Sequence, residues 1–311
     1  MRSKKDYILL FFKGIGMGGA DVVPGVSGGT VAFITGIYEE FLDSIKSVNF
    51  DNLKLLFTGN FKSFWANING GFLVTLFLGI LISVKSLATL MAYLIQAYPI
   101  QLWSFFFGLI IISSMVVLRQ VAKWNIGVVL SIGIGIASAY LITSSTPAST
   151  PDSLIMVFIS GTVAICAMIL PGISGAFILL ILGKYKYVVE ALSNMDIVVI
   201  LTFAAGCLVG ISSFARVVAW LLKKYHNIAI AILSGFMLGS LNKIWPWKQV
   251  LEFRLDSHGK KIPFIETNIL PSNFYQTTGQ DPFILQAILF MAIGFFLVVV
   301  IEKIALMIES K

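Results

Sequence analysis

The chain has 311 residues, of which 58% are hydrophobic and 12% are charged, with a formal net charge of +7. Soluble domains carry about a quarter charged residues, and a mean hydropathy of +0.92 corresponds to more apolar surface than a water-soluble core can bury. The composition excludes an ordinary soluble domain and predicts a polytopic membrane protein. Its basic residues border apolar spans, so they indicate topology and not nucleic-acid binding.

The first expected element is an uncleaved N-terminal helix. Basic residues within the first five positions precede an apolar stretch, as in a signal peptide, but residues 14–30 contain no cleavage site followed by a polar mature domain. This stretch ends in the motif ADVVPGVSGGT at residues 20–30. Pro24 and Gly25 within it remove a helical hydrogen bond and permit unusual backbone angles, which predicts a helix broken inside the membrane.

Longer apolar spans follow this motif and a second copy of it. They are expected at residues 71–96, 101–118 and 125–141, and again at 197–222, 228–244 and 283–301. Spans of this kind approach or reach the roughly 20 residues that a helix needs to cross a bilayer core. The polar loop at 246–282 is expected to form a small external cap.

An internal repeat relates the two sets of spans. The second copy of the motif, AMILPGISGAF at residues 167–177, follows the first by 147 residues, and eight of the nineteen positions from residue 20 to 38 are identical to their counterparts. Further along the chain, an offset of 131 residues pairs Lys85 with Arg216. A repeat of this extent predicts gene duplication and two related membrane halves.

The two halves, residues 1–145 and 146–311, are expected to have opposite orientations. We expect an all-α integral membrane protein with two inverted repeats, each a broken or re-entrant helix pair plus three transmembrane helices. If each pair enters and leaves on one side, three net crossings remain per half, and an odd number inverts the second half. The Lys/Arg distribution then predicts that both termini are in the cytoplasm, although Lys184 and Lys186 would face outward.

The broken helices are the candidate substrate site. Irregular backbone inside a membrane is tolerated only where it is buried in protein or lines a wet cavity, and the N–H groups of a resumed helix attract anions. The alternative is a kinked, tightly packed helix pair without a ligand. The candidate substrate-binding residues are Pro24, Gly25, Ser27, Gly28, Gly29 and Thr30 in the first copy, and Pro171, Gly172, Ser174 and Gly175 in the second.

Three charged residues complete the candidate site. Lys85 lies within an apolar span, and the 131-residue offset gives Arg216 the equivalent place. Intramembrane charges are expensive and usually functional, so we expect these two cations to admit an anion from opposite vestibules. Snorkelling to the cytoplasmic surface is the alternative for Arg216. Asp21, the only acid beside either motif, is expected either to cap the resumed helix or to bind a coupling proton or cation.

Enzymatic readings of the motifs are weak. Residues 14–19 fit the dinucleotide-binding pattern GxGxxG, but no strand precedes them. Residues 25–29 fit the serine nucleophile elbow, but a serine hydrolase needs a general base, and the two histidines, His226 and His258, fall in or near expected loops. Both cysteines lie in apolar segments, so neither a disulfide framework nor a metal site is expected. No catalytic residue and no cofactor is predicted, and an intramembrane lipid-phosphate enzyme is the weakest alternative.

The motifs resemble the signatures of a known family. ADVVPGVSGGT at 20–30, followed by ITGIYEE at 34–40, resembles the signature of the bacterial polyprenyl-phosphate transporter family, and LPGISG at 170–175 resembles its second signature. The resemblance covers essentially the whole chain. A small hydroxyl residue commonly follows the second Ser-Gly in that family, whereas Ala176 stands here.

This resemblance implies a flippase for undecaprenyl phosphate or a related polyprenyl phosphate. Transport from the outer to the cytoplasmic leaflet of the inner (plasma) membrane would recycle the carrier lipid of cell-envelope biogenesis. The residues by themselves predict only an inverted-repeat transporter for an anionic ligand in contact with membrane lipids, so a secondary transporter of a small soluble anion is the main alternative. Coupling to a proton or cation, and assembly into a homo-oligomer, are left open.

Overall fold

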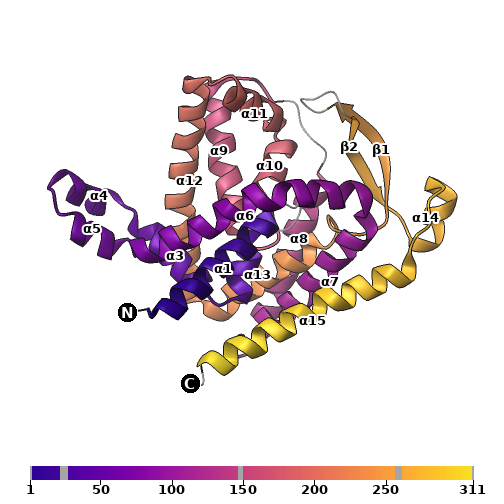
Figure 1. The fold of residues 1–311 in the computed structure, drawn as a ribbon, viewed down its shortest axis with the longest axis horizontal. Helices are drawn as coiled ribbons and strands as arrows, with labels where there is room; N and C mark the ends of the chain where they lie inside the picture. The colour runs from indigo at the N-terminus through magenta and orange to yellow at the C-terminus, as the bar shows by residue number, and fades with distance from the viewer. Residues whose placement is uncertain (1, 22–26, 146–149, 256–260, 310–311) are drawn as a thin grey trace.

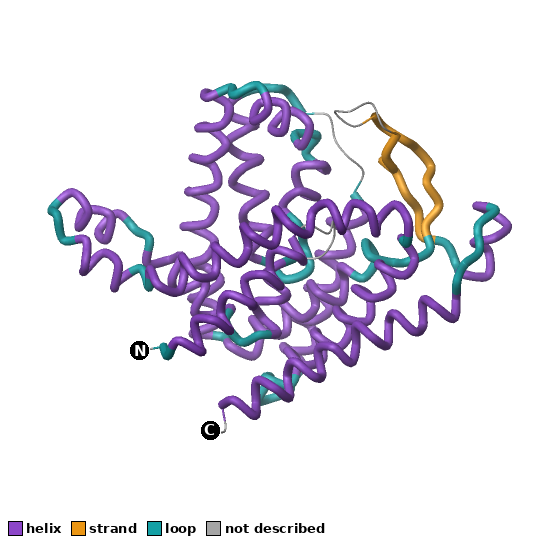
Figure 2. Tube along the Cα trace, in the orientation of Figure 1, coloured by secondary structure: helices purple, strands orange, loops and turns teal. Residues whose placement is uncertain are grey.

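The protein is mostly helical. The computed structural model describes residues 2–21, 27–145, 150–255 and 261–309, and its helices and single hairpin are drawn in Figures 1 and 2. The first part of the chain forms α1 (Lys4–Asp21), α2 (Gly28–Ile34), α3 (Tyr38–Ser47), α4 (Phe50–Phe57), α5 (Phe61–Asn67), α6 (Gly70–Ala97), α7 (Pro99–Leu118) and α8 (Ile126–Ser144). The second part forms α9 (Leu154–Ile169), α10 (Gly175–Ile181), α11 (Tyr185–Ser193), α12 (Ile197–Lys224), α13 (His226–Ser240), β1 (Lys248–Leu255), β2 (Lys261–Asn268), α14 (Pro271–Thr278) and α15 (Ile284–Glu309).

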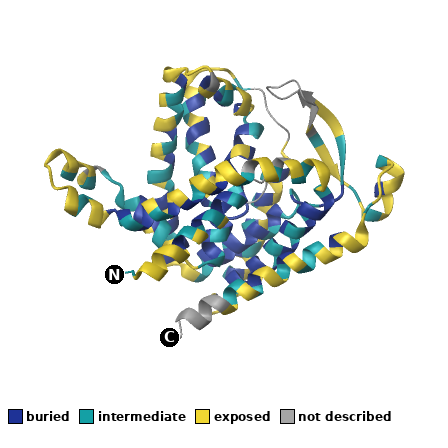
Figure 3. Cartoon of the chain, in the orientation of Figure 1, coloured by how far each residue is buried: buried dark blue, intermediate teal, exposed yellow. Residues whose placement is uncertain are grey.

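Five helices of the described chain are long and apolar enough to cross a membrane. They are α6, α7, α8, α12 and α15, and their spans match five of the six that the sequence predicts. The sixth, expected at 228–244, is α13, a shorter apolar helix of 15 residues. Large apolar side chains such as Leu81, Leu208 and Leu285 are exposed on these helices, as the exposed outer faces in Figure 3 show. The chain is therefore a helical membrane protein.

The polar segment after α13 contains the only strands within the described ranges. β1 and β2 pair antiparallel, and α14 follows them before α15 begins. Trp245 and Trp247 donate hydrogen bonds from their indole N–H groups to the carbonyls of Ile269 and Pro282, at 2.9 Å and 2.8 Å. These bonds join the two ends of the segment. The expected cap is thus a folded hairpin with a short helix, an exception to the predicted all-α fold.

Glycines bring the helix that begins each half, α1 or α9, into backbone contact with the first long span of that half, α6 or α12. A Cβ atom at Gly14 of α1 would lie 2.4 Å from the carbonyl oxygen of Leu76 in α6, and one at Gly161 of α9 would lie 2.5 Å from that of Phe203 in α12. Neither space admits a side chain. Small residues allow this close packing of membrane helices, where lipid tails remove the hydrophobic drive for association.

The next helices pair across the two halves. A Cβ atom at Gly108 of α7 would lie 2.0 Å from the carbonyl oxygen of Met291 in α15, and one at Gly235 of α13 would lie 2.4 Å from that of Ile132 in α8. The second long helix of each half therefore packs against the third long helix of the other. The two halves are interlocked around a core that contains Ile110, with none of its surface exposed.

Equivalent contacts in the two halves correct the register of the repeat. Phe203 follows Leu76 by 127 residues. Tyr98 and Tyr225, also 127 residues apart, end α6 and α12 with nearly the same backbone angles, φ −138° and ψ 52° against φ −131° and ψ 51°. The offset of these helices is therefore 127 residues and not 131. The extra segment in the first half is then 20 residues long and includes α4 and α5, which the sequence analysis did not predict.

This shift of one helical turn changes which residues correspond. Lys85 occupies the position equivalent to Ser212, and not to Arg216, so the pairing of the two cations was wrong. The physical reason is the four-residue spacing of small residues: Gly206 and Gly210 both make backbone contacts with α9. A slip of four residues therefore still aligns a glycine with a glycine.

Candidate functional site

The first motif supplies its own hydrogen-bond acceptors. Pro24 and Gly25 lie outside the described residues. Ser27 is the N-cap of α2, and its hydroxyl oxygen accepts the N–H of Gly29 at 3.1 Å. The Oδ1 atom of Asp21 accepts the N–H of Gly28 at 2.7 Å. The first backbone donors of α2 are therefore already occupied by side chains of the same motif, and Asp21 acts as a cap.

The first motif lies against the start of the second. The hydroxyl of Ser27 donates to the carbonyl oxygen of Met168 at 3.3 Å, and the hydroxyl of Tyr38 donates to that of Ile169 at 3.0 Å. Thr30 is fully buried, and its hydroxyl has no partner in the part of the chain that is described. The structure thus brings the two motifs together at the end of α9.

The second motif keeps its donors open. Gly172 has φ +90°, and a Cβ atom there would lie 2.8 Å from the hydroxyl oxygen of Ser240, so only glycine fits this turn beside Pro171. Ser174 precedes α10 but accepts no hydrogen bond from it, and its hydroxyl has no partner among the described residues. Met168 stands where the first copy has Asp21. No side chain therefore caps Gly175 at the start of α10.

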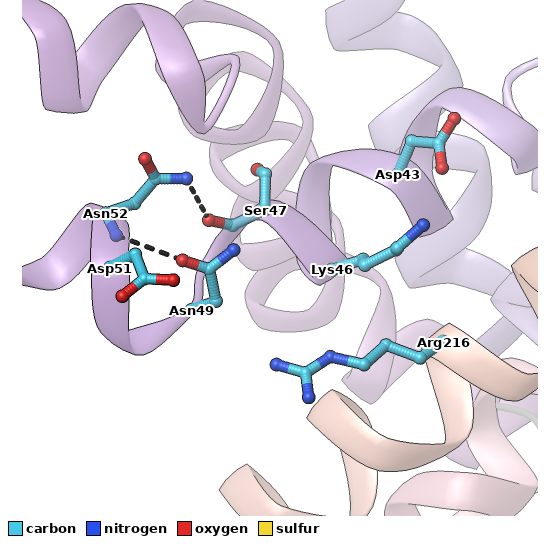
Figure 4. A pocket seen from close by; sticks show the side chains of 7 residues that line it. All are labelled: Asp43, Lys46, Ser47, Asn49, Asp51, Asn52 and Arg216. Carbon is cyan, nitrogen blue, oxygen red and sulfur yellow. Dashed lines mark hydrogen bonds between the residues drawn. The ribbon is translucent and has the colours of Figure 1, made fainter.

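Arg216 lines an open polar cavity away from the motifs. The cavity has a volume of about 460 Å³ and is lined by Asp43, Lys46, Ser47, Asn49, Asp51, Asn52 and Arg216. Figure 4 shows the guanidinium of Arg216 extending from α12 toward the beginning of α4, where Asn49 and Asp51 lie. Lys85 is exposed on α6. Neither cation forms an ion pair or hydrogen bond with a motif residue in the described ranges.

Sequence reasoning missed a cation cluster in the cap. The Nζ atoms of Lys243 and Lys248 lie 3.8 Å and 3.6 Å from the same carboxylate oxygen, Oε2 of Glu266. Each ammonium also lies 4.7 Å from the centre of an aromatic ring: Lys243 from Phe177 of α10, and Lys248 from Trp103 of α7. We call Lys243, Lys248 and Glu266 the cap cluster.

The cap cluster is largely, but not fully, removed from solvent. The side chain of Lys248 is 9% exposed, and those of Lys243 and Glu266 are 25% and 26% exposed. Burial lowers the pKa of Lys248 to about 8, although Glu266 acts in the opposite direction. Burial also lowers the pKa of Lys243. Desolvation thus outweighs attraction to the carboxylate, and one Glu266 only partly neutralises the two lysines when both are protonated.

The cap cluster lies beside the second motif. Phe177, whose ring faces Lys243, is in the first turn of α10, directly after the motif. Ser240, which contacts the motif at Gly172, is three residues before Lys243. The sequence signal for this cluster was a pair of lysines that flank the aromatic segment IWPW. These lysines fall in a long loop, where positive charge says little about membrane topology.

Long apolar helices and two similar motifs in contact with each other define the class: a polytopic helical membrane protein. The chain matches the model of the undecaprenyl phosphate translocase-like family over residues 17–262. It is 44% identical over 300 residues to the polyprenyl-phosphate transporter of Vibrio cholerae, covering 96% of this chain and 97% of that protein. It is 31% identical over 253 residues to the polyprenyl-phosphate transporter of Staphylococcus aureus, covering 75% and 84%.

These matches place the chain in a family. It belongs to the undecaprenyl phosphate translocase-like family, a family of membrane transporters and not of enzymes. The family resemblance of the two motifs is thereby confirmed. No solved structure matches the chain.

Proposed function

We propose that the protein moves undecaprenyl phosphate, or a related polyprenyl phosphate, from the outer to the cytoplasmic leaflet, so that the carrier lipid is reused. The observation that carries this proposal is the 44% identity to a protein named polyprenyl-phosphate transporter over nearly the full length of both chains. The structure adds a physical basis. An anionic headgroup needs polar groups inside the membrane, and a prenyl tail needs apolar surface around them.

The proposed architecture is a pair of inverted repeats, residues 1–145 and 146–311, in the inner membrane with both termini in the cytoplasm. Matching glycine contacts in the two halves support two related units. Cysteine labelling tests their orientation. In a variant without Cys166 and Cys207, Gln280→Cys in the cap should react with an impermeant thiol reagent added outside, whereas Lys123→Cys should not. Labelling of both positions from one side would contradict the inversion.

The proposed substrate site consists of the two motifs, with Asp21 as a coupling residue. The set retained from the sequence is Pro24, Gly25, Ser27, Gly28, Gly29, Thr30, Lys85, Pro171, Gly172, Ser174, Gly175 and Arg216. Support comes from the contact between the motifs and from the hydroxyls of Thr30 and Ser174, which have no partner in the described chain. Buried hydroxyls without partners are unfavourable, and a bound phosphate would satisfy them.

A proteoliposome assay tests the function. Purified protein is reconstituted, and transbilayer movement of a polyprenyl phosphate is compared with movement of inorganic phosphate, with substrate supplied on either side. We expect protein-dependent movement of the lipid and none of inorganic phosphate. Protein-free vesicles measure spontaneous flipping. Movement of inorganic phosphate without the lipid would favour the alternative, a secondary transporter of a small soluble anion, and would reject this proposal.

A further inference from the structure

The charges of the cap cluster do not balance. Two ammonium groups share one carboxylate oxygen, so the cluster carries an excess of one positive charge when both lysines are protonated. Two aromatic rings lie against the ammonium groups and partly shield them from water. A partly desolvated positive charge attracts an anion far more strongly than an exposed one, because less water competes and screening is weaker.

The ion pairs of the cluster are also loose. Charge-assisted N–H···O bonds are about 2.7–2.9 Å long, whereas Glu266 lies 3.6 Å and 3.8 Å from the two ammonium groups. The shortest bond of Lys248 is to the backbone carbonyl of Lys243, at 2.6 Å. Each ammonium has three donors, so both lysines retain donors that Glu266 does not use well.

The position of the cluster connects it to the second motif. Lys243 faces Phe177 in the first turn of α10, and the open donor Ser174 lies three residues before Phe177. A phosphate bound by the two lysines would therefore be on the cap side of the motif whose donors are free. A phosphate monoester offers several strong acceptor oxygens and up to two negative charges, which suits two lysines better than a single carboxylate does.

We propose that Lys243 and Lys248 form a binding site for the phosphate group of a phosphate monoester at the cap side of the second motif, with Glu266 as the counter-ion that the phosphate displaces. This site deepens the proposed function, on which its biological role rests: it would receive the headgroup of the lipid before the motifs do. The same chemistry would accept free phosphate, so the two sources must be separated experimentally.

Binding to the full-length protein in detergent provides the test. The probes are a short-chain prenyl phosphate and inorganic phosphate, each titrated against wild type, Lys248→Met and Glu266→Gln. Methionine keeps an unbranched apolar stem against Trp103. We expect Lys248→Met to bind prenyl phosphate about 10-fold more weakly, because one charge-assisted hydrogen bond is lost. Glu266→Gln should bind several-fold more tightly, because the competing carboxylate is gone.

Lys186→Met is the matched control. Lys186 is a lysine of α11, 72% exposed and paired with Glu190, and its replacement should leave both dissociation constants unchanged. If the cluster only anchors the hairpin, Lys248→Met and Glu266→Gln should both lower the unfolding temperature while neither changes phosphate affinity, and that result would overturn the site. Competition by inorganic phosphate at the same concentration as the prenyl phosphate would identify free phosphate as the ligand.

The two proposals fail separately. If wild-type protein binds prenyl phosphate in a Lys248-dependent way but does not move it in proteoliposomes, the site stands and the transport proposal fails. If the protein moves the lipid while Lys248→Met binds and moves it like wild type, transport stands and the cap-cluster site is rejected.

Discussion

The two copies of the Pro-Gly-x-Ser-Gly motif have the same sequence pattern but different hydrogen bonding. In the first copy, Asp21 and Ser27 accept the N–H groups of Gly28 and Gly29. In the second copy, Met168 replaces the aspartate, and the hydroxyl of Ser174 makes no hydrogen bond within the described chain. The first two N–H groups of α2 are thus capped by side chains of the first copy, where only the Thr30 hydroxyl lacks a partner in the described chain, whereas no side chain caps α10 in the second copy.

This difference suggests that the two copies of the motif took on different roles after duplication. The first motif is fastened to the end of α9 by Ser27 and Tyr38, so it contributes mainly to holding the centre of the protein together. The second has open donors and the cap cluster beside it. A phosphate stripped of water needs charge-assisted hydrogen bonds, and in this structure the second motif and the cap cluster are the better source of them.

The largest expected effect comes from closing the turn of the second motif. Gly172→Val places a branched side chain at φ +90° and against the hydroxyl of Ser240, 2.8 Å from the new Cβ. We expect a loss of at least about 2 kcal/mol of stability and of phosphate binding. Thermal unfolding in detergent measures the first and ligand titration the second. Gly133→Val in α8 is the control, since nothing lies within 4 Å of its Cβ position.

The next effect is a pH dependence of phosphate binding at the cap cluster, beside the second motif, with no counterpart at the first motif. Because the pKa of Lys248 is lowered to about 8, its charge is present below that pH and is lost as pH rises through it. Phosphate binding should therefore weaken above about pH 8. Glu266→Gln should move this midpoint to lower pH, because the charge of Glu266 raises the pKa of Lys248. A midpoint unaffected by Glu266→Gln would contradict the assignment to Lys248.

The paired serine variants test the comparison directly. Ser27→Ala removes an N-cap and should cost about 1 kcal/mol of stability with little change in phosphate affinity, because the hydroxyl is already engaged. Ser174→Ala should leave stability nearly unchanged and weaken binding by about 10-fold if the hydroxyl donates one bond to the phosphate. Unfolding curves and titrations on both proteins give the answer. The reverse pattern would assign the phosphate to the first motif.

The sequence predicted most of the fold because its signals are local. Long apolar runs and Pro-Gly breaks depend on neighbouring residues alone, so the long spans and interrupted helices were found. The hairpin β1–β2 and helices α4 and α5 were missed. The cap cluster was also missed because it forms only when the hairpin folds against Trp103 and Phe177, which are distant in sequence. Likewise, Ser27 and Ser174 are indistinguishable until their hydrogen bonds are known.

A smaller and more selective effect is expected for Asp21→Asn. The Oδ1 atom of Asp21 accepts the N–H of Gly28, and asparagine keeps a carbonyl oxygen at that position, so stability should change by no more than about 0.5 kcal/mol. If Asp21 couples transport to a proton or cation, the variant should bind the lipid normally but lose uphill transport in proteoliposomes with an imposed gradient. Uphill transport equal to wild type would leave Asp21 with a capping role alone.

The smallest effects are expected for Lys85 and Arg216, which form no ion pair or hydrogen bond with a motif residue in the described ranges. Lys85 is exposed on α6, two residues from the end of the candidate span Gly70–Leu87, so its long side chain can extend toward the membrane surface. Arg216 is exposed and lines an open cavity that also contains Asp43, Asp51 and Lys46, so water and ions screen its charge. Lys85→Met and Arg216→Met should each reduce the initial rate of lipid movement by less than about 3-fold, against about 10-fold for Lys248→Met.

Rates measured at low and high salt would sharpen the contrast, because only the exposed cations should lose their contribution at high salt. A 10-fold lower rate of lipid movement in Lys85→Met, with phosphate binding by Lys248→Met unchanged, would show that the cation on α6 contributes more to transport than the cap cluster does.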